Sequence, residues 1–430
     1  MDPRRISGTW YLSATAVMVT TCPTWAVDGT PSWFESTVAT IPGGFYASSP
    51  DLAFDHFGTP SVSWSQAANP TGTNTVHLSQ LLGLGLWSTE TFASGVDTGL
   101  LTALSFDRAE RPTVSWVNGD GTVQASFNHL APMAVGSGAA TAKPIVSLAH
   151  DLAGDLRGLY GRSSTGNFFG IGYSGGSFSS GDLFTMSGLS SVLDAAIVSD
   201  QRGMRQVAAR GILSGGEEAV LIASEPPGGG NWPIGQLATA SSVSGVDIAI
   251  DPTDGRPALA YTTFDGVTTS RLFYSKFTGF TMQTTQILSS TTSLFEDVSL
   301  AFDFSDGRPA IAFERRTFAP FAQEVLFAYR DAGANWQTSL VDSTVSLDAP
   351  TGRPRRPSLA FDDYGTSFPA IAYVDSDGSL NVAFDPPVPE PATACLVMLA
   401  IGLGGARRFR GRTAVESRRG IHAHNASPSR

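Results

Sequence analysis

The stretch "DGRPAIAF", Asp306–Phe313, has a near copy upstream in "DGRPALAY", Asp254–Tyr261. The two copies lie 52 residues apart. A single copy would suit an active-site motif, whereas a faithful copy at a distance suggests repeated architecture. The rest of the chain decides between these interpretations, because an architectural repeat has to recur beyond these two places.

A short apolar run that ends in Asp recurs along the whole chain. Five clear instances, "DLAFD", "ALSFD", "DIAID" and "SLAFD" twice, end at Asp55, Asp107, Asp251, Asp303 and Asp362. Weaker instances end at Asp151 and Asp200, which gives successive spacings of 52, 44, 49, 51, 52 and 59 residues. Seven units with a period of roughly 50 residues are typical of solenoids, propellers or arrays.

Each unit has the pattern of four strands. The first run is apolar or alternating, as in a buried strand, and a polar turn leads to a second run that Pro often opens. A third run follows, and the fourth begins with an aromatic residue that has an apolar residue five positions later, as in Trp336 and Val341. The body shows no helical periodicity. We therefore predict an all-β fold for residues 27–385, a seven-bladed β-propeller of four-stranded blades.

The last unit lacks its fourth run, because the chain leaves the third run, Leu380–Phe384, through Asp385-Pro386-Pro387. Near the start of the chain, "WFESTVAT" has the spacing of a fourth strand in Trp33 and Val38. We therefore expect Trp33–Thr40 to be the outer strand of the last blade. Such pairing would tie the two ends of the body together and close the ring.

Charge and cysteine content exclude several classes of function. Residues 27–391 hold 36 acidic and 18 basic residues, and an acidic body argues against binding nucleic acid through its phosphates. Cations or neutral ligands remain compatible with this charge. The cysteines, Cys22 and Cys395, both lie in the terminal segments. The body therefore has no disulfide framework, no Cys-based metal site and no thiol nucleophile.

The N-terminus has the pattern of a secretory signal peptide over residues 1–26. Arg4 and Arg5 precede an apolar run, and Thr24-Trp25-Ala26 resembles a small-x-small cleavage site. A buried N-terminal helix is the alternative. Cleavage by signal peptidase is the expected fate of this segment, so that the chain is exported.

The C-terminus has three parts, namely Pro389-Glu390-Pro391, an apolar run from Ala392 to Ala406, and an Arg cluster that begins with Arg407 and Arg408. Fifteen helical residues span about 22 Å, less than the roughly 30 Å hydrocarbon core, so membrane contact should be transient. This pattern resembles the PEP-CTERM sorting signal over residues 386–412. The resemblance implies processing by an exosortase, a membrane transpeptidase, and delivery to the cell surface or extracellular matrix. Residues 413–430 are expected to be a basic disordered tail, and an ordinary C-terminal anchor helix is the alternative for the apolar run.

Motifs that carry catalysis or bind cofactors are scarce in the body. The turns around Asp254 and Asp306 look slightly like calcium loops, but they lack the further oxygen ligands and late Glu of such loops. We expect their Asp and Gly to form turns instead of binding calcium. His56, His77, His129 and His150 have no metal-ligand spacing. We expect no metal, no cofactor and no enzymatic activity, with Ca²⁺ at these turns as the alternative.

Recognition is expected in the loops that do not repeat. The segment "ERRTFAPFAQ", which joins the second and third strands of one unit, mixes charge with aromatic residues. The candidate binding residues are Glu314, Arg315, Arg316, Phe318 and Phe321. A solvated loop whose arginines pair with nearby acids is the alternative.

The sequence thus predicts an exported binding or structural module of the cell surface or extracellular matrix, with an extracellular polysaccharide or protein as its partner. The alternative is a secreted polysaccharide hydrolase or lyase on the same scaffold. A carboxylate pair and an Arg facing one central pocket would favour the enzyme, whereas a flat or Gly/Ser-lined rim would favour binding.

Overall fold

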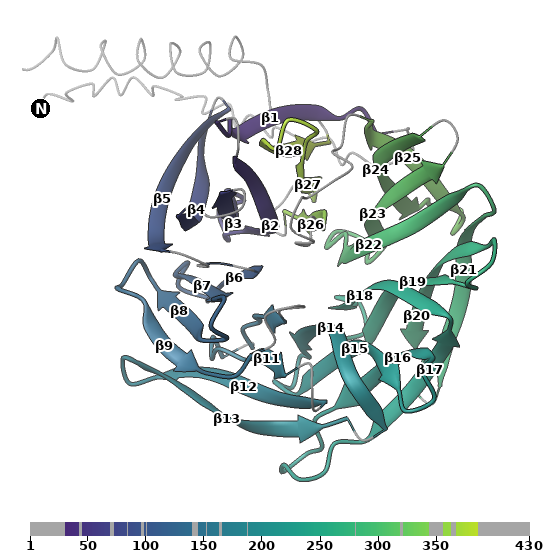
Figure 1. Ribbon diagram of the computed structural model, residues 1–430, viewed down its shortest axis with the longest axis horizontal. Helices are drawn as coiled ribbons and strands as arrows, with labels where there is room; N and C mark the ends of the chain where they lie inside the picture. Colours follow the sequence, from purple (N-terminus) through teal and green to yellow (C-terminus); the bar gives the residue numbers. More distant parts are fainter. Residues whose placement is uncertain are drawn as a thin grey trace, which may run out of the picture.

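The computed structural model describes residues 31–385, except 43–44, 69–72, 84, 96–98, 100, 140–144, 152, 163–165, 187, 280, 319–320, 344–355 and 363–366. In these ranges the chain forms seven antiparallel four-stranded sheets around a central axis (Figure 1), which confirms the predicted seven-bladed propeller. The predicted terminal segments, 1–26, 386–412 and 413–430, lie outside the described residues. Within the described part, no helix is long and apolar enough to cross a membrane.

The strands of each blade follow one another from the axis outward, except in the last blade. Blades one and two comprise β2 (Phe45–Phe54), β3 (Pro60–Ala68), β4 (Asn74–Gly83), β5 (Leu86–Gly95) and β6 (Leu101–Phe106), β7 (Pro112–Val117), β8 (Val123–Phe127), β9 (Met133–Gly136). Blades three and four comprise β10 (Val146–Ser147), β11 (Gly158–Arg162), β12 (Asn167–Ser174), β13 (Ser177–Thr185) and β14 (Leu189–Ser199), β15 (Arg205–Leu213), β16 (Glu218–Ser224), β17 (Ile234–Ala240). Blades five and six comprise β18 (Ser242–Ile250), β19 (Pro257–Phe264), β20 (Ser270–Phe277), β21 (Met282–Ser290) and β22 (Ser293–Phe302), β23 (Pro309–Phe318), β24 (Phe321–Arg330), β25 (Trp336–Asp342).

The last blade is built from both ends of the body, as predicted. Its inner strands are β26 (Ser358–Phe361), β27 (Pro369–Val374) and β28 (Leu380–Phe384), and its outer strand is β1 (Phe34–Ala39). The antiparallel pairing of β1 with β28 runs from Phe34 opposite Phe384 to Ala39 opposite Leu380. Val38 of β1 packs into the apolar cluster between this blade and the first.

The repeated stretch "AIAF" packs on both of its faces. Ala310 and Ala312 belong to the apolar cluster between blades six and seven, whereas Ile311 and Phe313 belong to the cluster between blades five and six. All four side chains are buried. Side chains alternate between the faces of a strand, so a strand with neighbours on both sides is apolar throughout. The buried apolar residues of the described ranges form seven such clusters, one at each blade interface.

The Asp that ends each first strand organises the turn that follows. Asp107 Oδ1 accepts the N–H groups of Ala109 and Arg111, both at 2.9 Å. Asp55, Asp151 and Asp200 accept the N–H groups at the same two offsets. In the "DGRP" turns, Gly307 has a φ of 73° and donates to the carbonyl of Asp303 at 2.8 Å. The repeated Asp and Gly are therefore turn-forming residues, in line with the architectural interpretation.

Candidate functional site

The five candidate binding residues lie in the sixth blade, but the segment predicted as a loop is mostly strand. β23 continues to Phe318 and β24 begins at Phe321, so the loop assignment was wrong for most of "ERRTFAPFAQ". Aligning the repeated apolar runs could not show this, because β23 and β24 are longer than the part of the strands that repeats from blade to blade.

Three of these five residues have partners in their own blade. Glu314 is buried and accepts a hydrogen bond from the amide of Gln323 at 2.7 Å. Arg315 Nε lies 2.5 Å from Glu324 Oε2, and Arg316 Nε lies 3.0 Å from Glu296 Oε2. Each arginine is thus neutralised by a carboxylate, as the alternative interpretation described. Phe318 is 54% exposed and stays available to a ligand.

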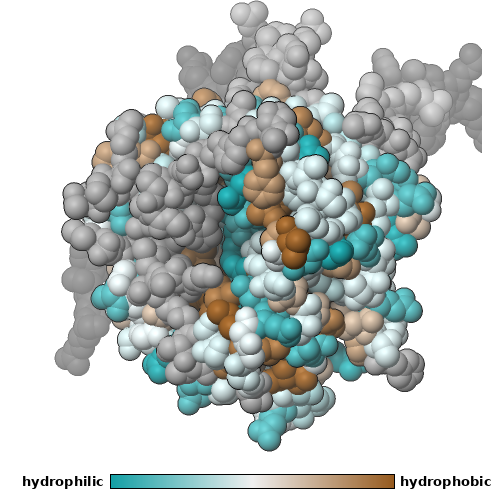
Figure 2. Space-filling model, turned by 45° about the vertical axis from the view of Figure 1, so that its right-hand side comes forward, coloured by the Kyte–Doolittle hydropathy of each residue, from teal (hydrophilic) through white to brown (hydrophobic). Residues whose placement is uncertain are grey.

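An ion-pair cluster lies in the central channel. Asp194, Asp297 and Arg356 each stand six residues before the Asp that ends the first strand of their blade. Arg356 Nη2 lies 2.6 Å from Asp194 Oδ1, and its Nε lies 3.8 Å from Asp297 Oδ1. Figure 1 places β14 and β26 on opposite sides of the central opening, so the side chain of Arg356 has to reach across the axis. Figure 2 shows hydrophilic residues within the hollow near its middle, with hydrophobic residues beside them.

Two further carboxylates line the channel. Burial raises the pKa of Asp51 to about 6, although the N–H of Leu104, 2.7 Å from Oδ2, and the hydroxyl of Ser358 favour its ionised form. Burial also raises the pKa of Asp247 to about 7, against the hydrogen bond from the N–H of Leu300 to Oδ2 at 2.7 Å. These oxygens are occupied by backbone donors of the neighbouring blades. Asp51 and Asp247 therefore connect neighbouring blades, and the oxygens that accept these hydrogen bonds are not free to bind a ligand.

An enzyme was expected to have a carboxylate pair and an Arg that face one central pocket. Part of this arrangement is present, because carboxylates and one Arg face the axis. However, Arg356 is already paired with Asp194, so the two charges compensate each other. No group of three or more His, Cys, Asp or Glu side chains in the described ranges is arranged to hold a metal ion.

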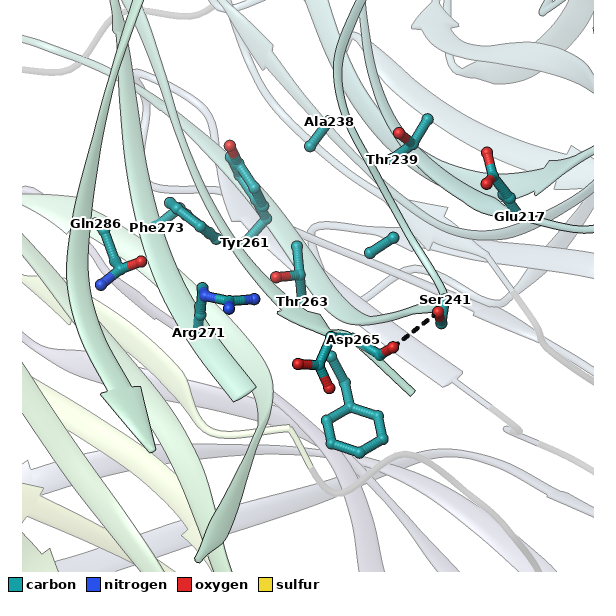
Figure 3. A pocket seen from close by; sticks show the side chains of 12 residues that line it. Glu217, Ala238, Thr239, Ser241, Tyr261, Thr263, Asp265, Arg271, Phe273 and Gln286 are labelled. Atoms are coloured by element: carbon teal, nitrogen blue, oxygen red, sulfur yellow. Dashed lines mark hydrogen bonds between the residues drawn. The ribbon is translucent and has the colours of Figure 1, made fainter. Parts of the chain in front are cut away.

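A pocket of about 490 Å³ opens between blades four and five (Figure 3). Glu217 comes from the β15–β16 turn, Ser241 from the β17–β18 turn and Asp265 from the β19–β20 turn. These turns join second to third strands and fourth to next first strands, so the pocket lies on the same face as the β23–β24 connection of the sixth blade. Asp265 lies in the stretch "TTFDGVTTS", residues 262–270, which has no copy in the other blades.

Aromatic and polar side chains share the wall of this pocket. The rings of Tyr261 and Phe273 stack at 5.1 Å between centroids, with 21° between their planes. Tyr261 is buried, whereas Phe273 is partly exposed. Arg271 and Gln286 stand beside Phe273 in Figure 3. Among the described residues, the guanidinium of Arg271 has no hydrogen-bond or ion-pair partner, so all of its donors are open to a ligand.

Asp265 is fixed rather than available as a proton donor. Its Oδ1 accepts the N–H groups of Thr269, Val267 and Thr268 at 2.8–3.0 Å. These hydrogen bonds hold the pKa of Asp265 far below its usual range. Its backbone carbonyl accepts the hydroxyl of Ser241 at 3.0 Å, which ties the turns of the two blades together. The pocket is therefore pre-formed by turn hydrogen bonds on both of its sides.

The sequence does not match any protein-family model or any curated protein. The fold, in contrast, resembles several solved structures at low sequence identity. One is a protein of unknown function from Dyadobacter fermentans, with a TM-score of 0.52 and 10% identity, covering 81% of this chain and 97% of that one. The BP39L lectin from Burkholderia pseudomallei has a TM-score of 0.52 and 13% identity, covering 81% and 95%. An oligogalacturonate lyase in complex with manganese has a TM-score of 0.51 and 9% identity, covering 83% and 97%. These similarities establish the propeller fold and nothing more about this chain.

Proposed function

We propose that this chain is an exported propeller of the cell surface or extracellular matrix that binds saccharides through the pocket between blades four and five. The combination of Phe273 with the unpaired Arg271 carries the proposal. A partly exposed aromatic ring can stack on the apolar face of a sugar, and a guanidinium and an amide can donate to its hydroxyls. Binding sites of this type combine apolar walls with a few convergent polar groups.

Two further observations support a binding role. The pocket is walled by three turns with fixed hydrogen bonds, so a ligand would pay little ordering entropy on entering it. A lectin is among the structures that share this architecture, so the scaffold is compatible with saccharide recognition.

The test is a glycan-array screen of the full chain, followed by titration of the strongest glycan into three variants. Phe273→Ala and Arg271→Gln should each weaken binding at least tenfold. Phe318→Ala serves as the control, because it removes the exposed aromatic side chain of the sixth-blade candidate patch. Unchanged affinity in the first two variants would overturn the pocket assignment, and loss of binding in Phe318→Ala alone would move the site to blade six. A screen without any glycan binding would overturn the saccharide proposal.

The export route forms the second part of the proposal and rests on the two terminal patterns. Signal peptidase would remove residues 1–26, and an exosortase-type transpeptidase would act near Pro389-Glu390-Pro391. Changing Arg407 and Arg408 to Ala should reduce surface delivery, measured by protease accessibility on intact cells. Surface delivery equal to that of the parent chain would argue against the sorting assignment.

A polysaccharide-acting enzyme is the second candidate, because carboxylates and Arg356 gather at the channel axis. It predicts the release of reducing ends from an extracellular polysaccharide by the full chain, and loss of that release in Asp297→Asn. An inactive parent chain across a panel of neutral and acidic polysaccharides would exclude this candidate.

A further inference from the structure

A second, larger cavity lies on the opposite face of the same blade interface. This cleft of about 1200 Å³ is walled by the β14–β15 and β18–β19 turns and by the β16–β17 and β20–β21 turns. These turns join first to second and third to fourth strands, so the cleft opens away from the saccharide pocket. Its size exceeds the range of about 300–1,000 Å³ that is common for small-molecule sites, which leaves room for an extended ligand.

In five consecutive blades an arginine stands directly before the second strand or is its first residue. These arginines are Arg111, Arg157, Arg205, Arg256 and Arg308. Four of them pair with a carboxylate of their own blade, namely Asp107, Asp151, Glu225 and Asp306, at N–O distances of 2.5 to 2.9 Å. The shared position therefore has a structural role in those four blades.

Arg256 is the exception, because Lys276 has taken the carboxylates that it would use. Lys276 Nζ lies 2.5 Å from Asp251 Oδ2 and 3.0 Å from Asp254 Oδ2. Lys276 is one of only two lysines in the chain. In the part of the chain that the structure describes, the exposed guanidinium of Arg256 has no carboxylate partner. This free cation lines the cleft.

A second free guanidinium lines the same cleft. Arg202 occupies the β14–β15 turn, where Asp200 Oδ1 accepts its backbone N–H at 2.9 Å, while its side chain is exposed and has no partner among the described residues. The cleft also contains the polar side chains of Gln201 and Gln236 and the partly exposed ring of Phe277.

We infer that this cleft binds a carboxylated oligosaccharide, such as a chain of uronic acid residues. A guanidinium binds a carboxylate with two parallel hydrogen bonds, and two guanidinium groups would suit carboxylates on successive sugars. The amides of Gln201 and Gln236 can donate to and accept from sugar hydroxyls, and Phe277 offers a face for stacking. Asp200, Glu225 and Asp254 also line the cleft, but Asp200 accepts turn N–H groups, Glu225 pairs with Arg205, and Asp254 pairs with Lys276. More distant negative charges of the body are screened, because the Debye length at physiological salt is about 8 Å. The inference concerns a different site from the saccharide pocket and does not depend on it.

The test is calorimetric titration of the full chain with β-1,4-linked tetraglucuronate and with cellotetraose, which has the same linkage but no carboxylates. Tetraglucuronate should bind at least tenfold more tightly than cellotetraose. Arg202→Gln and Arg256→Gln should each reduce that affinity about tenfold. Both variants should keep the parent affinity for the glycan selected by the array, which Phe273→Ala weakens, so failure of one site is distinguishable from failure of the other.

Arg111→Gln is the matched control, because it removes the equivalent arginine from a blade where a carboxylate already pairs with it. Its affinity for tetraglucuronate should equal that of the parent. Equal binding of the two tetrasaccharides, no loss in Arg202→Gln and Arg256→Gln, or an equal loss in Arg111→Gln would overturn the inference. Displacement of tetraglucuronate by a modest excess of inorganic phosphate would also overturn it, because the cleft would then be a general anion site.

Discussion

Asp51 of the first blade accepts the backbone N–H of Leu104 in the second blade, with 2.7 Å between Oδ2 and N. Asp51 stands four residues before the Asp that ends its strand, and the same position in four other blades carries Ser147, Asp247, Ser299 and Ser358. Each of these side chains accepts the N–H of the inner strand of the next blade, at Ile197, Leu300, Leu359 and Leu52. Inner strands are the free edges of their sheets, and these bonds satisfy edge donors that would otherwise be unpaired in the channel.

Using two carboxylates for this purpose should make stability depend on pH. Asp51 and Asp247 have pKa values raised to about 6 and about 7 by burial, against a usual value of 3.8. A raised carboxyl pKa stabilises the fold below the unfolded pKa, and this stabilisation is lost as pH rises through the folded pKa. Between pH 5 and pH 8 the ionisation of the two groups should lower the free energy of unfolding by about 4 kcal/mol.

Urea unfolding of the variant Asp51→Asn/Asp247→Asn should show a flatter pH dependence than the parent and higher stability at pH 8. The Asn side chains keep an acceptor for Leu104 and Leu300. Asp182→Asn, at an exposed site, should follow the parent curve. Because burial lowers the pKa of His77 and gives the opposite slope, the informative quantity is the difference between variant and parent. Identical slopes in parent and variant would contradict this role.

Removing Arg356 should destabilise the closed ring. Arg356→Met leaves Asp194 and Asp297 without their shared cation, and breaking a buried ion pair from one side typically costs about 3–5 kcal/mol. The loss should be smaller at pH 5 than at pH 8, because burial raises the pKa of Asp297 and its carboxyl can protonate once the cation is removed. Thermal unfolding at the two pH values measures this. Arg330→Met, on the outside of blade six, should change stability by less than about 0.5 kcal/mol, and an equal effect of both variants would argue against a special role for the channel cluster.

The Asp residues that end the first strands should contribute more to stability than exposed carboxylates do. Asp107 is buried, and although burial opposes its ionisation, hydrogen bonds from Arg111 hold its pKa below the usual range. Asp107→Ala would leave the N–H groups of Ala109 and Arg111 without their acceptor, at a cost of about 2–3 kcal/mol. Asp120→Ala removes a single exposed turn bond to Thr122 and should cost less than about 1 kcal/mol. Chemical denaturation measures the loss of unfolding free energy in the two variants. Equal losses would show that the repeated Asp contributes no more to stability than an exposed turn Asp.

The closing strand should be essential for cooperative unfolding. Val38→Ala should cost about 2 kcal/mol, because Val38 is buried between the last and first blades. Phe34→Ala, in the same strand but 43% exposed, should be nearly neutral. Deleting residues 32–40 should broaden the thermal transition, since β28 then becomes an open edge. A deletion variant that melts as sharply as the parent would contradict the closing role of β1.

The sequence predicted the fold well because every blade repeats the same local rules. The Asp-ended run, the Pro that opens the second strand and the offset between Trp33 and Val38 are all visible within one unit. Residues that act between units were harder to find. Arg315 and Arg316 looked free in the sequence, but strand pairing places Glu324 opposite Arg315 and brings Glu296 near Arg316.

The candidate sites depend on differences between repeats, and only some of these differences are visible in the sequence. Asp194, Asp297 and Arg356 share one offset from the strand-ending Asp, and this signal was available in the sequence alignment. In contrast, the free state of Arg256 depends on where Lys276 points, which no local pattern encodes. Arg271 and Phe273 likewise line a pocket only because blade four supplies its other wall.

The way in which the ring closes also bears on mechanical load. The chain leaves the body directly after β28, which lies between β27 and β1 in its sheet. A pull on the C-terminal end therefore acts along a strand that is hydrogen-bonded on both sides, so both ladders have to shear together instead of peeling one bond at a time. If the protein is tethered through its C-terminal segment, β1 helps to bear the force that is applied to β28.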